Sequence, residues 1–129
     1  MDLSNYDLRT KAEDGHALTV LDPITFKPTD LVIHVIGSDS KVFRRARAQA
    51  LRDVAKAPKE GEEFDTDTVL AKVCAGCVTG WENMIENGEP VAFSTEKALD
   101  LLTRMGWLLD QVSGAIETRA NFTKPAETN

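Results

Sequence analysis

Cys74 and Cys77 have the spacing that most resembles a catalytic motif in this chain. Two cysteines separated by two residues support disulfide exchange when they lie at a helix N-terminus, where the helix dipole lowers a thiol pKa. Here the pair falls about two turns inside a predicted helix, and the dipole acts mainly within the first turn. Both cysteines also occupy apolar positions of that helix, so we expect them to pack in the core. Thiol redox catalysis is the alternative, and it requires a depressed thiol pKa.

We expect the two histidines to form no metal site with these cysteines. A structural zinc ion needs four ligands, and neither His16 nor His34 has a recognisable metal spacing. His16 follows Gly15 in a predicted loop, and His34 lies in a β-branched run, on the face opposite Ile33. The sequence also has no nucleophile elbow and no phosphate-binding glycine loop. We therefore expect no catalytic residues, no cofactor, no metal and no enzymatic activity.

One predicted helix carries a cluster of basic residues. The cluster consists of Arg44, Arg45 and Arg47, with Lys41 and Arg52 nearby. A basic helix is how many small domains contact nucleic acid, so a small nucleic-acid-binding regulator is the alternative function. The net charge of −6 favours a protein-binding or solvated face instead, because a negative protein lacks long-range attraction to phosphates. No aromatic residues are interleaved with the arginines, which points the same way.

Charge is segregated along the chain. Residues 41–60 carry seven bases and two acids, whereas residues 61–97 carry eight acids and two bases. Such segments can meet across an interface, either inside one molecule or between copies of it. We therefore predict self-association between an arginine face and an acidic connection. The arginine face is Arg44, Arg45 and Arg47, and the acidic connection is Glu82, Glu86 and Glu89.

Two runs near the N-terminus predict the β-strands on which these helices pack. Residues 17–21 mix β-branched and apolar side chains and end at the turn signal Asp22-Pro23. Residues 31–36 are the strongest strand signal in the chain, and Gly37 ends it. We expect the two runs to pair as an antiparallel hairpin within residues 15–37, with a connection of about nine residues that is long for a hairpin.

Two helices are predicted in the middle of the chain from apolar residues three or four positions apart. The first is capped by Ser38 or Asp39, and its inward residues are Phe43, Ala46, Ala50, Leu51 and Val54. The second is capped by Asp65 or Thr66. It is expected to continue past the cysteines through Trp81 and Ile85 and to stop at Asn87-Gly88, where a left-handed residue is available.

Two further helices complete the chain. One is capped by Ser94 or Thr95 and is broken or bent at Gly106, and the other runs from about Gly106 to about Arg119. Trp107 follows the apolar spacing of the last helix, so we expect it in the core, as we do Trp81.

The predicted fold is α+β and mainly α-helical, with an N-terminal β-hairpin followed by about four helices in one domain over residues 1–129. Residues 38–122 form its helical part, residues 58–63 read as a linker, and residues 1–14 and 123–129 are expected to be flexible. No apolar run approaches the roughly 20 residues of a membrane span, and no signal pattern precedes the domain. We expect a soluble, intracellular protein.

Three segments of the second half resemble the tail assembly chaperones of long-tailed bacteriophages, and the match extends over residues 69–122. They share a Trp, a short acidic turn containing glycine, an aromatic residue followed by Ser or Thr, a helix, and a terminal Asn-Phe. In this chain the segments are Trp81-Glu82-Asn83, Asn87-Gly88-Glu89-Pro90-Val91-Ala92-Phe93-Ser94 and Ala120-Asn121-Phe122.

The resemblance implies a small factor in the cytoplasm of the bacterial host cell that is absent from the mature virion. Such proteins bind the tape measure protein, whose long helices would otherwise aggregate, and help recruit tail tube protein subunits around it. In this family a ribosomal frameshift commonly adds a longer product, and the polar tail after Phe122 suits such a junction. We assign Trp81 and Phe93 to folding first and to partner binding second.

Overall fold

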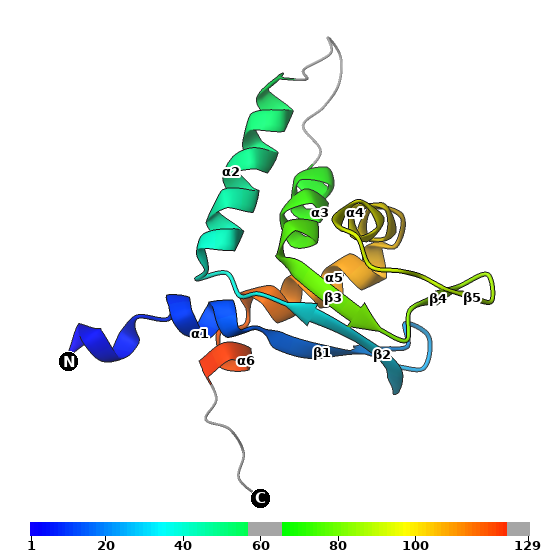
Figure 1. The fold of residues 1–129 in the computed structure, drawn as a ribbon, viewed down its shortest axis with the longest axis horizontal. Coiled ribbons are helices and arrows are strands. Elements are labelled where there is room, and N and C mark those ends of the chain that lie inside the picture. The colour runs from blue at the N-terminus through cyan, green and yellow to red at the C-terminus, as the bar shows by residue number, and fades with distance from the viewer. Residues whose placement is uncertain (57–65, 124–129) are drawn as a thin grey trace, which may run out of the picture.

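The computed structural model describes residues 1–56 and 66–123 and shows a mainly helical α+β fold (Figure 1). A three-stranded antiparallel sheet has the order β1-β2-β3, from β1 (His16–Leu21), β2 (Pro28–Val35) and β3 (Val78–Glu82). The longer helices are α2 (Lys41–Lys56), α3 (Thr66–Cys77), α4 (Thr95–Arg104) and α5 (Gly106–Glu117). The short elements are η1 (Leu3–Tyr6), α1 (Arg9–Asp14), α6 (Ala120–Thr123) and a small hairpin of β4 (Ile85–Glu86) and β5 (Glu89–Pro90).

The antiparallel pairing of β1 with β2 confirms the predicted hairpin. Leu18 pairs opposite Ile33, and the side chains of Val20, Ile33 and Val35 are buried. The connection is ordered by Asp22, whose carboxylate accepts hydrogen bonds from two backbone amides of the following turn at 2.7 and 3.0 Å. The β-branched run thus forms a strand with one face on the core, as its composition predicts.

The predicted helix through Trp81 and Ile85 is wrong beyond Cys77. The α3 helix ends there, and the chain continues as β3, in which Trp81 pairs opposite Ile33. The free edge of β2 offers backbone partners to this segment, and the β-branched residues Val78 and Thr79 favour a strand over a helix. A long-range pairing therefore overrides the helical spacing of the apolar residues.

Asn87 and Gly88 do not stop a helix. They form the two-residue turn between β4 and β5, with φ of 53° and 78°. Two consecutive left-handed residues suit the tightest β-hairpin turn, and Asn-Gly is the sequence that favours it most. The hairpin extends from the body on the side opposite the N-terminus (Figure 1).

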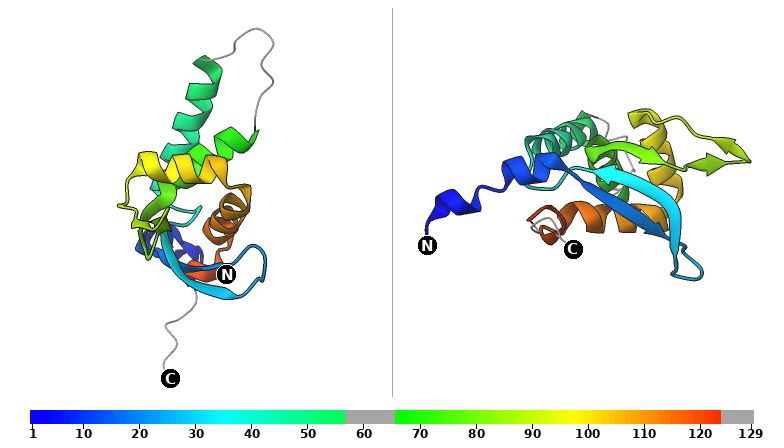
Figure 2. Two further views of the ribbon diagram at one scale, coloured as in Figure 1. Left: turned by 90° about the vertical axis from the view of Figure 1, so that its right-hand side faces the viewer. Right: turned by 60° about the horizontal axis from the view of Figure 1, so that its bottom comes forward.

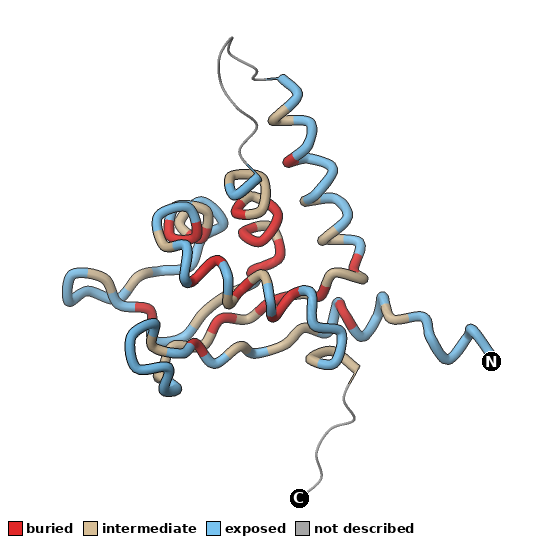
Figure 3. Tube along the Cα trace, turned by 180° about the vertical axis from the view of Figure 1, so that it is seen from behind, coloured by how far each residue is buried: buried red, intermediate tan, exposed pale blue. Residues whose placement is uncertain are grey.

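The core lies where the sheet meets α3, α4 and α5 (Figure 3). Its most buried side chains include Val35, Cys77, Val112 and Ile116. Leu51 and Trp107 were predicted to lie inside, but they are 48% and 37% exposed. The C-terminal half of α2 extends beyond the sheet and packs against α3 (Figure 1; Figure 2, left). Leu51 is exposed because the neighbouring Ala50, 2% exposed, occupies the face of α2 that meets α3.

Apart from the end of α3, the helix termini lie close to the predicted positions. Ser40, rather than Ser38 or Asp39, caps α2, because its Oγ accepts a hydrogen bond from the Phe43 amide at 3.0 Å. Ser94 caps α4 as expected, accepting from the Lys97 amide at 3.0 Å. The break between α4 and α5 falls at Met105, next to the predicted Gly106.

The N-terminal segment has more structure than the sequence suggests. Residues 1–14, expected to be flexible, contain η1 and α1, and Ala12 of α1 is 2% exposed. Ala12 lies against Gly37, near the Phe122 ring of α6. The predicted linker at residues 58–63, the possible cap at Asp65 and most of the predicted tail lie outside the described residues.

Candidate functional site

The two cysteine thiols lie in the core rather than in a reactive cleft. Cys74 is 2% exposed and Cys77 is 0% exposed, and neither forms a disulfide. Burial, together with the nearby Cys77 in the case of Cys74, raises the pKa of each thiol to about 12. Thiol exchange needs the opposite shift, so these residues stabilise the packing of α3 against its neighbours.

The histidines make local contacts at the sheet. The Nε2 atom of His34 on β2 lies 3.3 Å from a carboxylate oxygen of Glu82 on β3, and both side chains are largely exposed. The His16 ring packs edge-on against Phe122 with ring centroids 5.9 Å apart. Within residues 1–56 and 66–123, no three His, Cys, Asp or Glu side chains are arranged to hold a metal ion.

Trp81 and Phe93 are brought together, although eleven positions in the chain separate them. The Trp81 Nε1 donates a hydrogen bond to the carbonyl oxygen of Val91 at 2.8 Å. The two aromatic rings meet edge to face, with centroids 4.9 Å apart and an interplanar angle of 83°. Trp81 is partly buried, whereas Phe93 is 37% exposed. The pair fixes the segment after β5 onto β3 and leaves part of the Phe93 side chain exposed.

Glu86 of the predicted acidic connection is engaged inside the molecule. Its carboxylate lies 3.0 Å from Arg104 and 3.1 Å from Lys97, both on α4. Asp100 joins the same network, 2.9 Å from Arg104 and 3.4 Å from Lys97. The Arg104 and Lys97 hydrogen bonds hold the pKa of the Glu86 carboxyl below its usual range. Glu86 therefore anchors the β4–β5 hairpin to α4.

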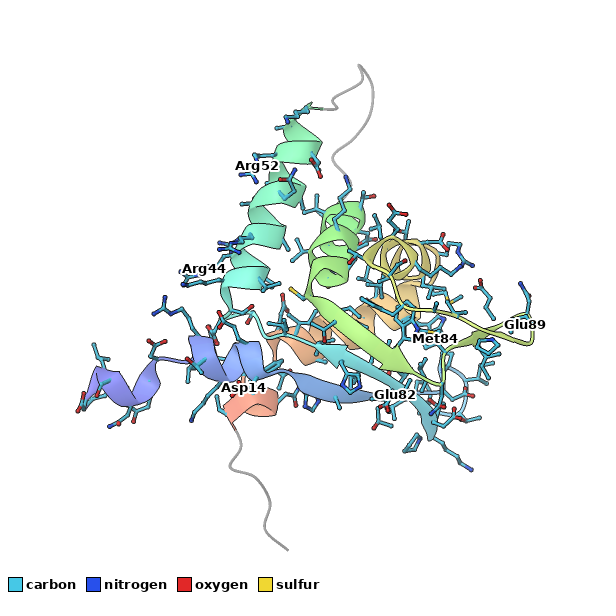
Figure 4. All side chains as sticks on the ribbon, in the orientation of Figure 1. Asp14, Arg44, Arg52, Glu82, Met84 and Glu89 are labelled. Carbon is cyan, nitrogen blue, oxygen red and sulfur yellow. The ribbon has the colours of Figure 1, made fainter. Side chains whose placement is uncertain are left out.

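The other two acids of the connection lie at the surface. Glu82 is paired with His34 across the sheet. Glu89 is exposed near the tip of the β4–β5 hairpin (Figure 4), and its side chain has no ion pair or hydrogen bond with the part of the chain that the structure describes. Of the three predicted acidic residues, Glu89 is thus the one whose carboxylate has no hydrogen bond or ion pair with the described residues.

The arginine face lies at the opposite end from this hairpin (Figure 4). Arg44 and Arg45 are exposed on α2, and the Arg47 guanidinium lies 6.0 Å from the centroid of the Phe43 ring. The structure therefore does not bring the arginine face and Glu89 together within one molecule.

Arg44 also borders a concavity of about 450 Å³ between α1, the start of α2 and the α5–α6 connection. Two ion pairs line it, Arg9 with Asp7 at 3.4 Å and Arg119 with Asp39 at 2.8 Å. We call this hollow the basic concavity. Its alternation of acids and bases differs from the uniformly positive surface that nucleic-acid binding favours. The sequence did not reveal it, because its residues come from three separate segments.

A shallow groove between α2, α3 and α4 was likewise not predicted from the sequence. Ala46 and Ala50 of α2 face Ala75 and Gly76 of α3, with Leu99 of α4 at the side. A Cβ atom on Gly76 would lie 2.8 Å from the Ala46 Cβ, so α2 and α3 approach as closely as these small residues allow. The four-residue spacing of the alanines on α2 was the available signal.

A model of the YdaY prophage protein family matches residues 38–128. No curated protein and no solved structure matches the chain. The matched range begins just before α2 and includes the arginine face, the Trp81–Phe93 pair and the β4–β5 hairpin. Among the described residues, no helix combines the length and apolar character needed to cross a membrane.

Proposed function

The chain belongs to the YdaY prophage protein family, and from that premise we propose that it is a tail assembly chaperone of a long-tailed bacteriophage. It binds the tape measure protein in the cytoplasm of the bacterial host and helps recruit tail tube subunits. It acts through protein contacts rather than catalysis, and it is absent from the mature virion. A longer product made by ribosomal frameshifting belongs to the same proposal.

One observation carries the proposal. The prophage family match spans residues 38–128, and the segments that resemble tail assembly chaperones all lie within that range. In the structure, the first two segments lie against each other. The Trp81 indole donates a hydrogen bond to the Val91 carbonyl oxygen and packs against the Phe93 ring. The first two of the three segments that carry the resemblance are therefore in contact in the folded chain.

The exposed aromatic face suits a helical partner. Phe93 loses little conformational freedom on binding, because Trp81 already holds its ring. Ile85 on the neighbouring hairpin is 64% exposed, and Trp107 at the start of α5 is 37% exposed. An exposed aromatic side chain that is held as Phe93 is makes a typical anchor for the apolar face of a partner helix.

Co-expression with the tape measure protein of the same phage tests the proposal. We expect the chain to raise the soluble fraction of the tape measure protein and to co-purify with it. Phe93→Ser should reduce both effects, because it removes the exposed anchor. Leu51→Ser is the matched control, since Leu51 is also an exposed apolar residue but lies on α2.

Thermal unfolding of both variants checks that they remain folded. If the tape measure protein stays equally insoluble with and without the folded wild-type chain, the proposed function is wrong. If Leu51→Ser reduces rescue and Phe93→Ser does not, the function stands but its assignment to Phe93 is wrong.

A further inference from the structure

The basic concavity carries one positive charge that nothing in it neutralises. Three arginines and two aspartates line it, and two of the arginines are taken by the ion pairs. The remaining one is Arg44, whose side chain makes no ion pair or hydrogen bond within residues 1–56 and 66–123. The carboxylates of Asp7 and Asp39 are already engaged by Arg9 and Arg119, so neither pairs with Arg44. The concavity is therefore suited to accept one additional carboxylate.

The β4–β5 hairpin carries such a carboxylate on a narrow, preorganised projection. The Asn87-Gly88 turn fixes its tip, and the Glu86 contacts with Lys97 and Arg104 fix its base on α4. Glu89 follows the turn directly and is exposed, as is Ile85 on the paired strand. Little conformational entropy is lost when a projection held in this way enters a partner.

We propose that the β4–β5 hairpin of one copy of the chain inserts into the basic concavity of a second copy, with Glu89 pairing to Arg44. The exposed Ile85 adds apolar area beside Tyr6 and Leu8, which also line the concavity. Complementary charge is the argument for a second copy as the occupant, because each molecule presents both halves of the contact.

The placement of the two halves determines the kind of assembly. Arg44 and Glu89 lie at opposite ends of the molecule (Figure 4). A contact between different surfaces of identical subunits is head-to-tail, and it leaves a free hairpin at one end and a free concavity at the other. The assembly therefore grows by adding copies head to tail, as an open chain or a closed ring, rather than stopping as a two-fold dimer. This contact goes beyond the proposed function and does not depend on the tape measure protein.

Charge reversal with rescue tests the contact. Sedimentation velocity at low ionic strength should show a mass that rises with concentration for the wild type and falls as salt is added. Arg44→Glu and Glu89→Lys should each weaken self-association by about tenfold or more, because each places like charges together. The double variant, and an equimolar mixture of the two single variants, should each restore association, since opposite charges again face one another.

Arg52→Glu is the matched control, because Arg52 is exposed on the same helix but does not line the concavity. It should associate as the wild type does. A wild-type chain that stays monomeric at every concentration would overturn the proposal. So would loss of association in Arg52→Glu to the same extent as in Arg44→Glu, or failure of the double variant and the mixture to restore it. Each of these results leaves tape measure binding to be decided by the co-expression experiment.

Discussion

The side-chain amide of Gln111 on α5 makes both hydrogen bonds that a neighbouring strand would make to Leu21 on β1. The Leu21 backbone amide donates to Oε1 at 2.8 Å, and Nε2 donates to the Leu21 carbonyl oxygen at 2.9 Å. Because β1 is an edge strand, this contact closes part of an edge that could otherwise pair with another chain. It also joins the sheet to the helix that covers it.

Gln111→Ala should therefore lower the free energy of unfolding by about 1 kcal/mol, the usual net loss when partly exposed hydrogen bonds are removed. It should also increase aggregation on storage, because the edge of β1 is uncovered. Urea denaturation followed by circular dichroism measures the first effect, and light scattering measures the second. Asp110→Ala on the same turn is the control and should change neither. Equal behaviour of the two variants would show that Gln111 does not protect the edge.

The hairpin of β1 and β2 could be predicted from the sequence because its signals are local. Residues 31–36 are β-branched and apolar, and Gly37 ends them. The strand β3 could not be predicted in the same way. Val78 and Trp81 continue the helical spacing of α3, and only the distant partner Ile33 on β2 decides that they form a strand.

The candidate surfaces show the same division. The exposure of Arg44 and Glu89 follows from their charge, and the capping role of Ser94 follows from its type and position. The engagement of Glu86 by Arg104 does not follow from the sequence, because it depends on how the hairpin folds back onto α4. The pair Asn87-Gly88 is typical of a two-residue hairpin turn. Because the sequence predicts a helix before it, the pair is interpreted as the end of that helix instead.

Gly76→Ala should destabilise the protein by about 1–3 kcal/mol, although alanine favours a helix, because the added methyl group displaces α2. The Cβ would lie 2.8 Å from the Ala46 Cβ, which is not at the end of a flexible side chain. Gly114→Ala in α5 is the matched control. A Cβ there meets nothing within 4 Å, so this variant should gain about 0.5–1 kcal/mol from helix propensity. Chemical denaturation measures both, and a stabilising Gly76→Ala would contradict the close packing of α2 on α3.

Glu86→Gln should remove a pH-dependent part of the stability. The pKa of Glu86 is lowered in the folded protein by Arg104 and then Lys97, so its contribution is present above the unfolded-state pKa of about 4.3. It is lost as pH falls through the lower folded-state pKa, when the carboxylate becomes protonated. Unfolding midpoints of wild type and Glu86→Gln should therefore differ at pH 7 and converge in acid.

Glu89→Gln, measured in dilute solution, is the control for this titration. It makes the same change on the same hairpin, at a side chain that has no ion pair with residues 1–56 or 66–123. Its midpoint should follow the wild type at pH 7. A gap between wild type and Glu86→Gln that is constant with pH would show that Glu86 acts through packing rather than charge.

Both thiols should be unreactive in the folded protein. Burial raises the pKa of Cys74 and Cys77 to about 12, so at pH 8 the thiolate that attacks alkylating reagents is scarce as well as inaccessible. Mass spectrometry after brief treatment with iodoacetamide should find the native chain unmodified and the denatured chain modified at both residues. Rapid modification of the native chain would restore the possibility of thiol redox activity.

Deletion of the gene from its prophage, followed by electron microscopy of the induced lysate, shows whether tail assembly requires the protein. Heads should form without tails, and tails should return when the wild-type chain is supplied from a plasmid. The folded Phe93→Ser variant should restore fewer tails than Leu51→Ser. Normal numbers of tails of normal length in the deletion would contradict a role in tail assembly.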